Sequence, residues 1–292
     1  MKPSESLHAF LKEKFDSEIT KHTPVGGGCI NDAARVSLAN GTTLFVKQNR
    51  RSLLDMFEKE ARGLELLNNA VSEIRIPEIV GVLDDESTDT SWLILSFVEE
   101  GRSTGDFDLR FGRALAEMHQ HRESRYGLDH HNYIGRLPQN NDWRDDWISF
   151  FRECRIEPQF KMAQQSGYFS KSTRQSLDHL FEALPDIFPD EPASLLHGDL
   201  WGGNYLCDKQ NRPVMIDPAV YYGHREMELA FTRMFGGFGA DFYRAYEEVW
   251  PLTPGFSQRK DIYNLYPLLV HVNLFGGAYV SQTESIIRRF QQ

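Results

Sequence analysis

The chain has 292 residues, a length that suits about two domains of ordinary size. Apolar residues make up 40% of it and charged residues 25%, a composition that excludes disordered and fibrous proteins. Because the formal net charge is −10 and basic residues do not cluster, nucleic-acid binding is not expected. Three cysteines without a CxxC pair, the lack of an apolar leader and the lack of a long apolar span together predict a cytoplasmic protein that does not enter the membrane.

Residues 1–100 are predicted to form a small lobe that contains an antiparallel sheet. The dipeptide Asn40-Gly41 lies between two apolar runs and is a strong signal for a two-residue hairpin. Helical spacing of apolar residues predicts two helices in the same region. The expected helices cover 7–15 and 52–69, and the expected strands cover 33–38, 42–47, 79–83 and 92–97.

Residues 101–292 are predicted to form a larger and mostly helical lobe, since glycine and charged residues interrupt the apolar pattern near 100–105. Helices are expected over 107–119, 142–157 and 171–184, and again from 226, from 240 and from 259. Two short apolar runs, 195–196 and 213–216, each lead into an acidic residue. They are expected to pair as a small hairpin that presents Asp199 and Asp217 at its rim.

The segment His197-Gly-Asp199 is followed by Asn204 and, thirteen residues later, by Asp217. Phosphoryl transfer needs a base that orients a hydroxyl and oxygen ligands that hold Mg²⁺ on the phosphates. Asp199 suits the base, and Asn204 and Asp217 are hard oxygen ligands of the type that Mg²⁺ prefers. A single Asp or Asn more often caps a turn, but the whole set at this spacing favours the chemical interpretation.

Lys47 ends an apolar strand, and Glu60 lies on the following helix among its leucines. A carboxylate inside an apolar arc needs a partner, because burying it unpaired costs several kcal/mol or more. The sequence therefore predicts a Lys47–Glu60 pair of the kind that positions nucleotide phosphates in kinases. Gly26, Gly27 and Gly28 precede this strand as a phosphate-covering loop would, although a glycine cluster is a weak signal by itself.

These features together resemble the protein-kinase-like fold, an α+β bilobal fold with a small antiparallel-sheet N-lobe (1–100) and a larger, mostly helical C-lobe (101–292). The segments His197–Asn204 and Ile216–Glu226 resemble the fructosamine kinase (ketosamine 3-kinase) family more closely. Shorter segments such as Leu274-Phe-Gly-Gly277 extend the resemblance over nearly the whole chain. One departure is Glu228, where the family pattern leads us to expect Asp, and this puts the support of the catalytic loop in question.

The resemblance implies that ATP and Mg²⁺ bind between the lobes, with the adenine on the linker backbone at Ser96, Phe97 and Val98. It also places Cys29 in the phosphate loop. Trp201 would stack on the substrate, although a structural role for this ring is equally expected. Asn132 and Gln139 lie in a glycine- and proline-broken stretch and are further candidates for the acceptor site.

The resemblance implies an ATP-dependent kinase that phosphorylates the O3 hydroxyl of ketosamines, which are sugar adducts of small amines or of protein lysines. Phosphate placed beside the C2 carbonyl is a leaving group whose elimination would release the amine, so the expected role is deglycation. Two alternatives stay open. The chain could be a kinase for another hydroxylated amine, as aminoglycoside and choline kinases are, or a nucleotide-binding scaffold that has lost activity.

Overall fold

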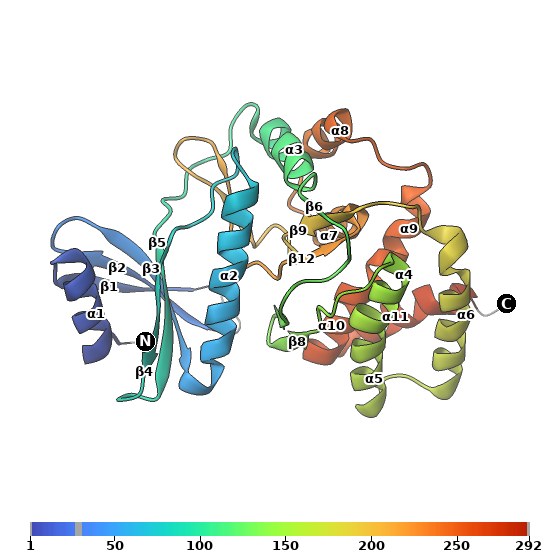
Figure 1. The fold of residues 1–292 in the computed structure, drawn as a ribbon, viewed down its shortest axis with the longest axis horizontal. Helices are drawn as coiled ribbons and strands as arrows, with labels where there is room; N and C mark the ends of the chain where they lie inside the picture. The colour runs from blue at the N-terminus through green and yellow to red at the C-terminus, as the bar shows by residue number, and fades with distance from the viewer. Residues whose placement is uncertain (1, 27–30, 291–292) are drawn as a thin grey trace. The chain divides into compact units, whose positions relative to one another are not determined.

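The computed structural model describes residues 2–26 and 31–290. The chain divides into two compact units, the first of which joins the residues up to 107 with 205–218 (Figure 1). The second joins 108–204 with the residues from 219 onward. The first unit thus extends past the boundary expected near residue 100 and also takes in a later segment.

The first unit is built on a five-stranded antiparallel sheet in the order β1-β2-β3-β5-β4. The expected hairpin is present, since Gly41 has a φ of 90° and the Leu38 amide donates to the Thr42 carbonyl at 2.8 Å. The elements up to residue 107 are α1 (Glu5–Phe15), β1 (Ile19–Val25), β2 (Asp32–Leu38), β3 (Thr43–Arg50), a 3₁₀ turn (Arg51–Leu53), α2 (Leu54–Ala70), β4 (Ile79–Asp85) and β5 (Thr90–Ser96).

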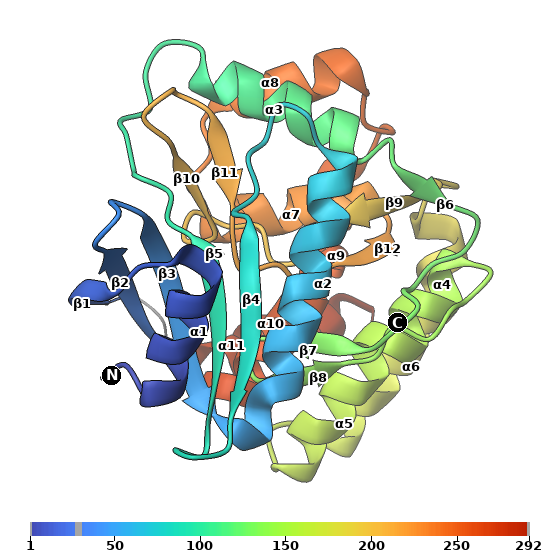
Figure 2. The same cartoon turned by 60° about the vertical axis from the view of Figure 1, so that its left-hand side comes forward.

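The two helices α1 and α2 lie on opposite faces of this sheet, as Figures 1 and 2 show. Leu44 and Val46 of β3 are buried in a cluster with Leu7 and Leu11 of α1. Successive strand residues point to opposite faces, so Lys47 points to the other face, where α2 packs. The alternation along one strand therefore determines which helix each residue of β3 meets.

Residues 205–218 belong to the first unit as a second hairpin, β10 (Tyr205–Cys207) and β11 (Pro213–Met215). The buried carboxylate of Asp208 closes its turn by accepting the amides of Gln210 and Arg212, each at 2.9 Å. Arg75 forms an isolated parallel bridge with Val214, which ties the hairpin to the segment before β4.

The second unit is mostly helical, with two small sheets. Its strands are β6 (Arg122–Glu123), β7 (Asn132–Ile134), β8 (Leu137–Gln139), β9 (Ala193–Leu196) and β12 (Tyr221–Gly223). Its α-helices are α3 (Phe107–Met118), α4 (Trp147–Phe150), α5 (Glu157–Gln165), α6 (Lys171–Ile187), α7 (Arg225–Phe235), α8 (Ala240–Val249), α9 (Phe256–Tyr263), α10 (Leu265–Phe275) and α11 (Ala278–Ile287). A 3₁₀ turn (Arg288–Phe290) ends the described part of the chain.

Two expectations for this region are wrong. The run 195–196 does not pair with 213–216, because β9 is buried at every position and bonds β12 on one side and β6 on the other. The helix expected over 142–157 begins only at Trp147 and contains a π-helical segment, Phe151–Ile156. That segment carries the fully buried Arg155, whose guanidinium lies 3.9 Å from the Tyr221 ring centroid.

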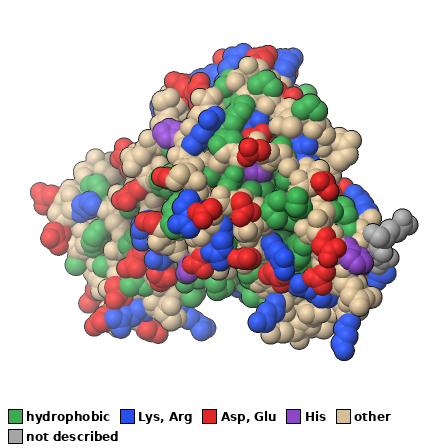
Figure 3. All heavy atoms as spheres, turned by 45° about the vertical axis from the view of Figure 1, so that its right-hand side comes forward, with side chains coloured by type: hydrophobic (Ala, Val, Ile, Leu, Met, Phe, Trp, Pro, Cys, Tyr) green, Lys and Arg blue, Asp and Glu red, His purple; other side chains and the backbone are tan. Residues whose placement is uncertain are grey.

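Among the residues described, no helix has the length and apolar character needed to cross a membrane. On the face drawn in Figure 3, acidic and basic side chains are interspersed and do not separate into a single basic patch.

Candidate active site

The first unit brings together three of the predicted site residues, Lys47, Glu60 and Asp217. The Lys47 ammonium Nζ lies 2.7 Å from Oε1 of Glu60 and 2.6 Å from Oδ1 of Asp217. The side chains of Lys47 and Glu60 are 6% and 14% exposed, whereas that of Asp217 is 47% exposed. The Lys47 ammonium is therefore shared by two carboxylates, and that of Asp217 is partly exposed to solvent.

This cluster follows from local structure. Lys47 points to the α2 face of the sheet, and Glu60 lies on the buried side of α2 between Phe57 and Leu64. Asp217 comes two residues after β11 and has a φ of 56°, a left-handed conformation that is uncommon for residues other than glycine. Strained backbone of this kind concentrates at functional sites.

Burial shifts the pKa values of the buried pair. It raises the pKa of Glu60 above its usual value, and the Lys47 charge opposes this shift without cancelling it. Burial by itself would lower the pKa of Lys47, but the charges of Glu60 and Asp217 together outweigh it, so the pKa of Lys47 rises. Lys47 therefore stays protonated at physiological pH, which is compatible with the predicted contact to phosphates.

The second unit brings together Asp199 and Asn204. The Asn204 amide nitrogen Nδ2 donates to the Asp199 backbone carbonyl and to its carboxylate oxygen Oδ2, each at 2.8 Å. Since both bonds use the amide nitrogen, the amide oxygen of Asn204 takes no part in them. The predicted base and one predicted metal ligand thus hold each other in place.

The carboxylate of Glu228 in α7 holds the backbone of the loop that carries Asp199. Its carboxylate accepts the His197 amide at 3.0 Å and the Gly198 amide at 2.7 Å. Gly198 has a φ of 83°, and a Cβ there would lie 2.1 Å from the Ala219 carbonyl oxygen, so this position requires glycine. The longer Glu side chain therefore supplies the support that the departure from Asp had put in question.

Glu228 is held in turn by a buried histidine. His119 Nε2 lies 3.0 Å from Oε2 of Glu228, and its Nδ1 lies 2.8 Å from the Tyr246 hydroxyl. Burial by itself would raise the pKa of Glu228, but the hydrogen bond and charge of His119, the charge of His197 and the Gly198 amide outweigh it, so the pKa lies below its usual value. Sequence reasoning missed His119 and Tyr246, because a polar residue on an apolar helix face gives no sign of its partner.

Trp201 lies two residues after Asp199 and is one of the few large apolar side chains that stay exposed, at 40%. A Cβ on Gly203 would come within 2.4 Å of the indole, so the ring packs directly on the glycine backbone. This position is compatible with the predicted stacking on a substrate.

Asn132 and Gln139 are buried, at 5% and 1% exposure. The Asn132 amide donates to the Val220 carbonyl at 2.9 Å, and the Gln139 amide donates to the Ala219 carbonyl at 3.0 Å. Burial and these bonds argue against direct contact with a substrate. The two amides instead hold the segment that follows Asp217.

The other residues predicted to bind the nucleotide lie in two segments, the end of β5 with the linker after it and the glycine-rich segment after β1. Ser96 and Phe97 use their backbone amides within the sheet, on the carbonyls of Glu78 and Thr43. Val98 is half-buried at the end of this segment, and Gly26 is exposed. Gly27, Gly28 and Cys29 lie outside the described residues.

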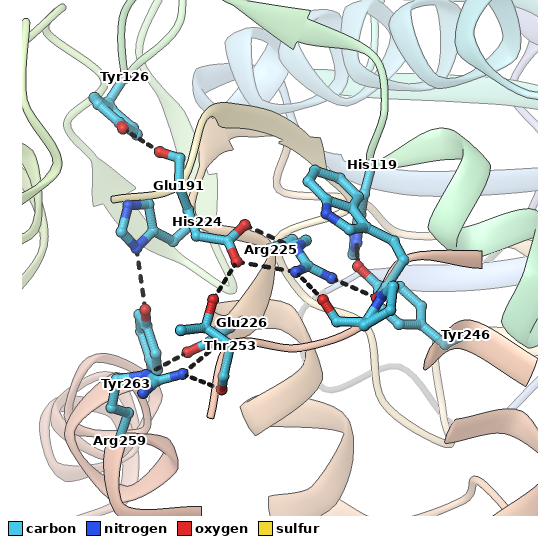
Figure 4. Close-up of polar contacts among 12 residues, drawn as sticks. His119, Tyr126, Glu191, His224, Arg225, Glu226, Tyr246, Thr253, Arg259 and Tyr263 are labelled. Atoms are coloured by element: carbon cyan, nitrogen blue, oxygen red, sulfur yellow. Dashed lines mark hydrogen bonds and ion pairs between the residues drawn. The ribbon is translucent and has the colours of Figure 1, made fainter. Parts of the chain in front are cut away.

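The second unit also contains two buried Arg–Glu pairs that sequence reasoning missed (Figure 4). Arg225 contacts Glu191 through two bonds, at 2.8 and 2.9 Å. Arg259 contacts Glu226 through two bonds, at 2.7 and 2.6 Å. Among the described residues, no group of three or more His, Cys, Asp or Glu side chains could hold a metal ion.

Comparisons with known proteins agree with these features. The fructosamine kinase family model matches residues 3–292. The chain is 38% identical over 277 residues to a probable ketoamine kinase of Vibrio parahaemolyticus, with 94% of each chain covered. It is 41% identical over 282 residues to a chloroplastic protein-ribulosamine 3-kinase of Arabidopsis thaliana, which covers 95% of this chain and 84% of the relative.

Solved structures give the same answer for the fold. A Thermobifida fusca crystal structure, provisionally described as a fructosamine-3-kinase, has a TM-score of 0.86 and 33% identity, with 99% of each chain covered. An aminoglycoside phosphotransferase in complex with AMP-PNP and hygromycin B has a TM-score of 0.65 at 19% identity, with 98% of each chain covered, and supports the fold alone. The predicted kinase-like fold and family are confirmed: the chain belongs to the fructosamine kinase family and is an ATP-dependent phosphotransferase that acts on an alcohol group.

Proposed function

We propose that the chain transfers the γ-phosphoryl group of ATP to the O3 hydroxyl of a ketosamine, with Asp199 as the base. The observation that carries this proposal is the fixed Asp199 carboxylate, oriented by the Asn204 amide at 2.8 Å on a loop that Glu228 braces. A positioned carboxylate can accept the hydroxyl proton as the phosphoryl group is transferred. The names of the Vibrio and Arabidopsis relatives support a ketosamine as the acceptor.

Asn204 and Asp217 would hold Mg²⁺. The amide nitrogen of Asn204 is already used on Asp199, so its oxygen is the atom left for a hard cation. Asp217 has a half-exposed carboxylate and shares a single ammonium with Glu60. Bound Mg²⁺ would neutralise charge on the phosphates, and these two residues fit its preference for oxygen ligands.

Lys47 would contact the phosphates, with Glu60 holding its ammonium in position. The adenine would bond the linker, where the amides of Ser96 and Phe97 are already used, so Val98 is the donor we propose. Gly26, Gly27 and Gly28 would cover the phosphates.

The proposed product explains a role in deglycation. Loss of a proton from C1 of a ketosamine 3-phosphate forms an enaminol, and the C3–O bond then breaks with phosphate as the leaving group. Water adds to the resulting imine and releases the free amine together with a dicarbonyl sugar. Glycated protein lysines are therefore proposed substrates beside small ketosamines, in a cytoplasmic setting.

The test is ATP turnover by the purified protein on a panel of acceptors. The panel contains fructosamines and ribulosamines of small amines, a glycated protein, choline and an aminoglycoside. We expect phosphate on O3 of the ketosamines, located by ³¹P–¹H NMR. Turnover confined to choline or the aminoglycoside would favour another hydroxylated amine, and the absence of turnover on every acceptor would favour a scaffold.

The metal ligands have a separate test in the Mg²⁺ dependence of the rate. Asp217→Ala removes a charged ligand and is expected to abolish turnover across the titration. Asn204→Ala removes a neutral ligand that water can replace, so it is expected to raise the Mg²⁺ concentration for half-maximal rate. An unchanged Mg²⁺ dependence in both variants would refute this pair of ligands.

A further inference from the structure

Five rings of the second unit form a continuous row that begins beside the proposed base. The Trp201 ring lies 6.4 Å from Phe235, and Phe235 is stacked on His271 at 4.7 Å between centroids. His271 in turn lies 4.9 Å from Tyr279 and 5.6 Å from Phe275. The row passes from the catalytic loop over α7 to α10 and α11, and we call it the ring row.

Three of these rings are each followed by two glycines. The shared pattern of an aromatic residue and a glycine pair occurs as Trp201-Gly-Gly203, Phe235-Gly-Gly237 and Phe275-Gly-Gly277. The first two turns touch, since a Cβ on Gly202 would lie 3.2 Å from the Gly237 Cα atom. Three separate parts of the chain therefore contribute a ring to the ring row, and in each the ring is followed by a glycine pair.

The third turn holds its ring in solvent. Gly276 and Gly277 both have a φ of 62° with ψ near −136° and −135°, a conformation that L side chains rarely adopt. Gly276 caps the end of α10 directly after Phe275, and Gly277 directly precedes α11, so that Tyr279 lies in the first turn of that helix. Phe275 is consequently 61% exposed, the highest value for a large apolar side chain among the described residues. Trp201, at the other end of the ring row, is 40% exposed, and contiguous exposed apolar surface, unlike one exposed side chain, is typical of a binding site.

His271 gives the ring row a hydrogen-bond acceptor, in addition to the indole N–H of Trp201 and the hydroxyl of Tyr279. Its Nδ1 lies 2.7 Å from the Pro267 carbonyl oxygen, which can only accept, so Nδ1 carries the hydrogen. Burial lowers the pKa of His271 below its usual value, and the ring is therefore neutral at pH 7. Nε2 then has a free lone pair that can accept an N–H or O–H donor.

The chemistry of the ring row selects one part of a ketosamine. No charged residue occurs in α10, and the carboxylate of Glu284 in α11 accepts a hydrogen bond from the Thr173 hydroxyl at 2.7 Å. Ring faces and a neutral acceptor bind ammonium groups and apolar chains, whereas they offer nothing to a phosphate or a carboxylate. In a ketosamine the ammonium nitrogen is bonded to C1, two carbons from the C3 hydroxyl that Asp199 would meet.

We propose that the ring row is the subsite for the N-substituent of the substrate. The secondary ammonium lies against the ring next to Asp199, that of Trp201, and an apolar or aromatic substituent continues along Phe235 and His271 toward Phe275 and Tyr279. This inference rests on the proposed ketosamine kinase function and names the acceptors it prefers, which are adducts of amines with extended apolar chains.

The experiment compares two ribulosamines that share the sugar and differ in the N-substituent, methyl or benzyl. We expect the wild-type kcat/KM to be about tenfold higher for the N-benzyl substrate. Phe275→Ala is expected to reduce that ratio to near one, while Phe275→Tyr retains it. Tyr243→Ala is the matched control, since Tyr243 lies on α8 against Arg233 and outside the ring row, and it should keep the wild-type ratio.

Equal kcat/KM values for both substrates in the wild-type protein would overturn this subsite and leave the proposed function intact. A ratio that Phe275→Ala does not change would overturn it as well. If neither ribulosamine is turned over while another hydroxylated amine is, the proposed function itself fails.

Discussion

The two units use buried charge in opposite ways. In the second unit two buried arginines, Arg259 and Arg225, each contact one carboxylate through two bonds, that of Glu226 and that of Glu191, so the charges of these two pairs balance. In the first unit the single ammonium of Lys47 contacts both Glu60 and Asp217, so one negative charge is left over. Closed pairs stabilise a fold, whereas an open cluster can still bind a cation.

This contrast separates structural acids from the acids of the proposed site better than burial does. Glu226 and Glu60 are both on the buried side of a helix, and sequence alone treats them alike. They differ in their cationic partner. Among the described residues, Arg259 contacts no carboxylate other than that of Glu226, whereas Lys47 contacts that of Asp217 as well as that of Glu60. The predictions below test this distinction through stability in the second unit and through catalysis in the first.

Glu226→Gln is expected to cost about 3–5 kcal/mol of unfolding free energy, because it leaves the Arg259 guanidinium buried without its counter-charge. The kcat of the folded variant should stay close to the wild-type value. Urea denaturation measures the first quantity and an ATP turnover assay below the melting temperature the second. The double variant Glu226→Leu with Arg259→Met should recover most of the loss, and an equal loss in both would contradict the balanced-pair interpretation.

Asp199→Asn should lower kcat by about 10²-fold or more, the scale of lost general-base catalysis, with little change in ATP affinity. Its unfolding free energy should stay close to that of the wild type, since the Asn204 amide can still donate to the new side-chain oxygen. Steady-state kinetics and denaturation on the same preparation give both values. A near-normal kcat in this folded variant would remove Asp199 from the chemistry.

Lys47→Met and Glu60→Gln should each raise the KM for ATP or lower kcat by at least about tenfold, or 1.4 kcal/mol. Because the two side chains act as one unit, the double variant should lose clearly less than the sum of the single losses. A double-mutant cycle on kcat/KM measures the coupling. Strictly additive losses would mean that Glu60 does not work through Lys47.

The smallest expected effect is a pH dependence from His224, which is stacked on Trp147 beside the balanced pairs. Burial, with the charges of Arg259 and Arg225, holds the pKa of His224 well below the usual 6.5. The unfolded chain therefore binds this proton first as the pH falls through 6.5, and the folded state loses stability there.

From pH 6.5 to 5.5 the His224 contribution should be about 1 kcal/mol, within the limit of 1.4 kcal/mol for one proton per pH unit. His224→Phe keeps an aromatic ring and should flatten the stability profile by that amount, as measured by urea denaturation at each pH. His121→Phe, at an exposed histidine, serves as the control. An unchanged slope in His224→Phe would show that His224 titrates alike in both states.

The structural features that were predicted correctly from the sequence are those that depend on residues close together in the chain. Asn40-Gly41 specifies a hairpin by its own backbone preferences, and the helical arc of α2 places Glu60 on the buried side before any partner is known. The features that were predicted wrongly or missed depend on contacts between segments far apart in the chain. The two bonding partners of β9, the π-helical segment and the His119–Glu228 contact all join parts of the chain that no local pattern relates.

The site shows the same division. Lys47 and Glu60 were predicted as a pair from residue type and spacing, and they meet as expected, whereas the contact of Lys47 with Asp217 was not predicted. The charge imbalance and the left-handed Asp217 could not be predicted, since both exist only once the chain is folded. Asn132 and Gln139 show the converse, because these polar residues of a broken stretch were candidates for the acceptor site and are instead buried, where they bond backbone carbonyls.

The interleaving of the two units has a consequence for synthesis on the ribosome. The first unit needs residues 205–218 to complete its hairpin and to give Lys47 its second carboxylate, yet residues 108–204 are made in between. At 5–20 residues per second, the first unit lacks residues 205–218 for roughly 5–20 s after its five-stranded sheet has been translated. During this interval a nascent chain has Lys47 and Glu60 without Asp217, so the cluster proposed to bind phosphates is completed only after residues 108–204 have been translated.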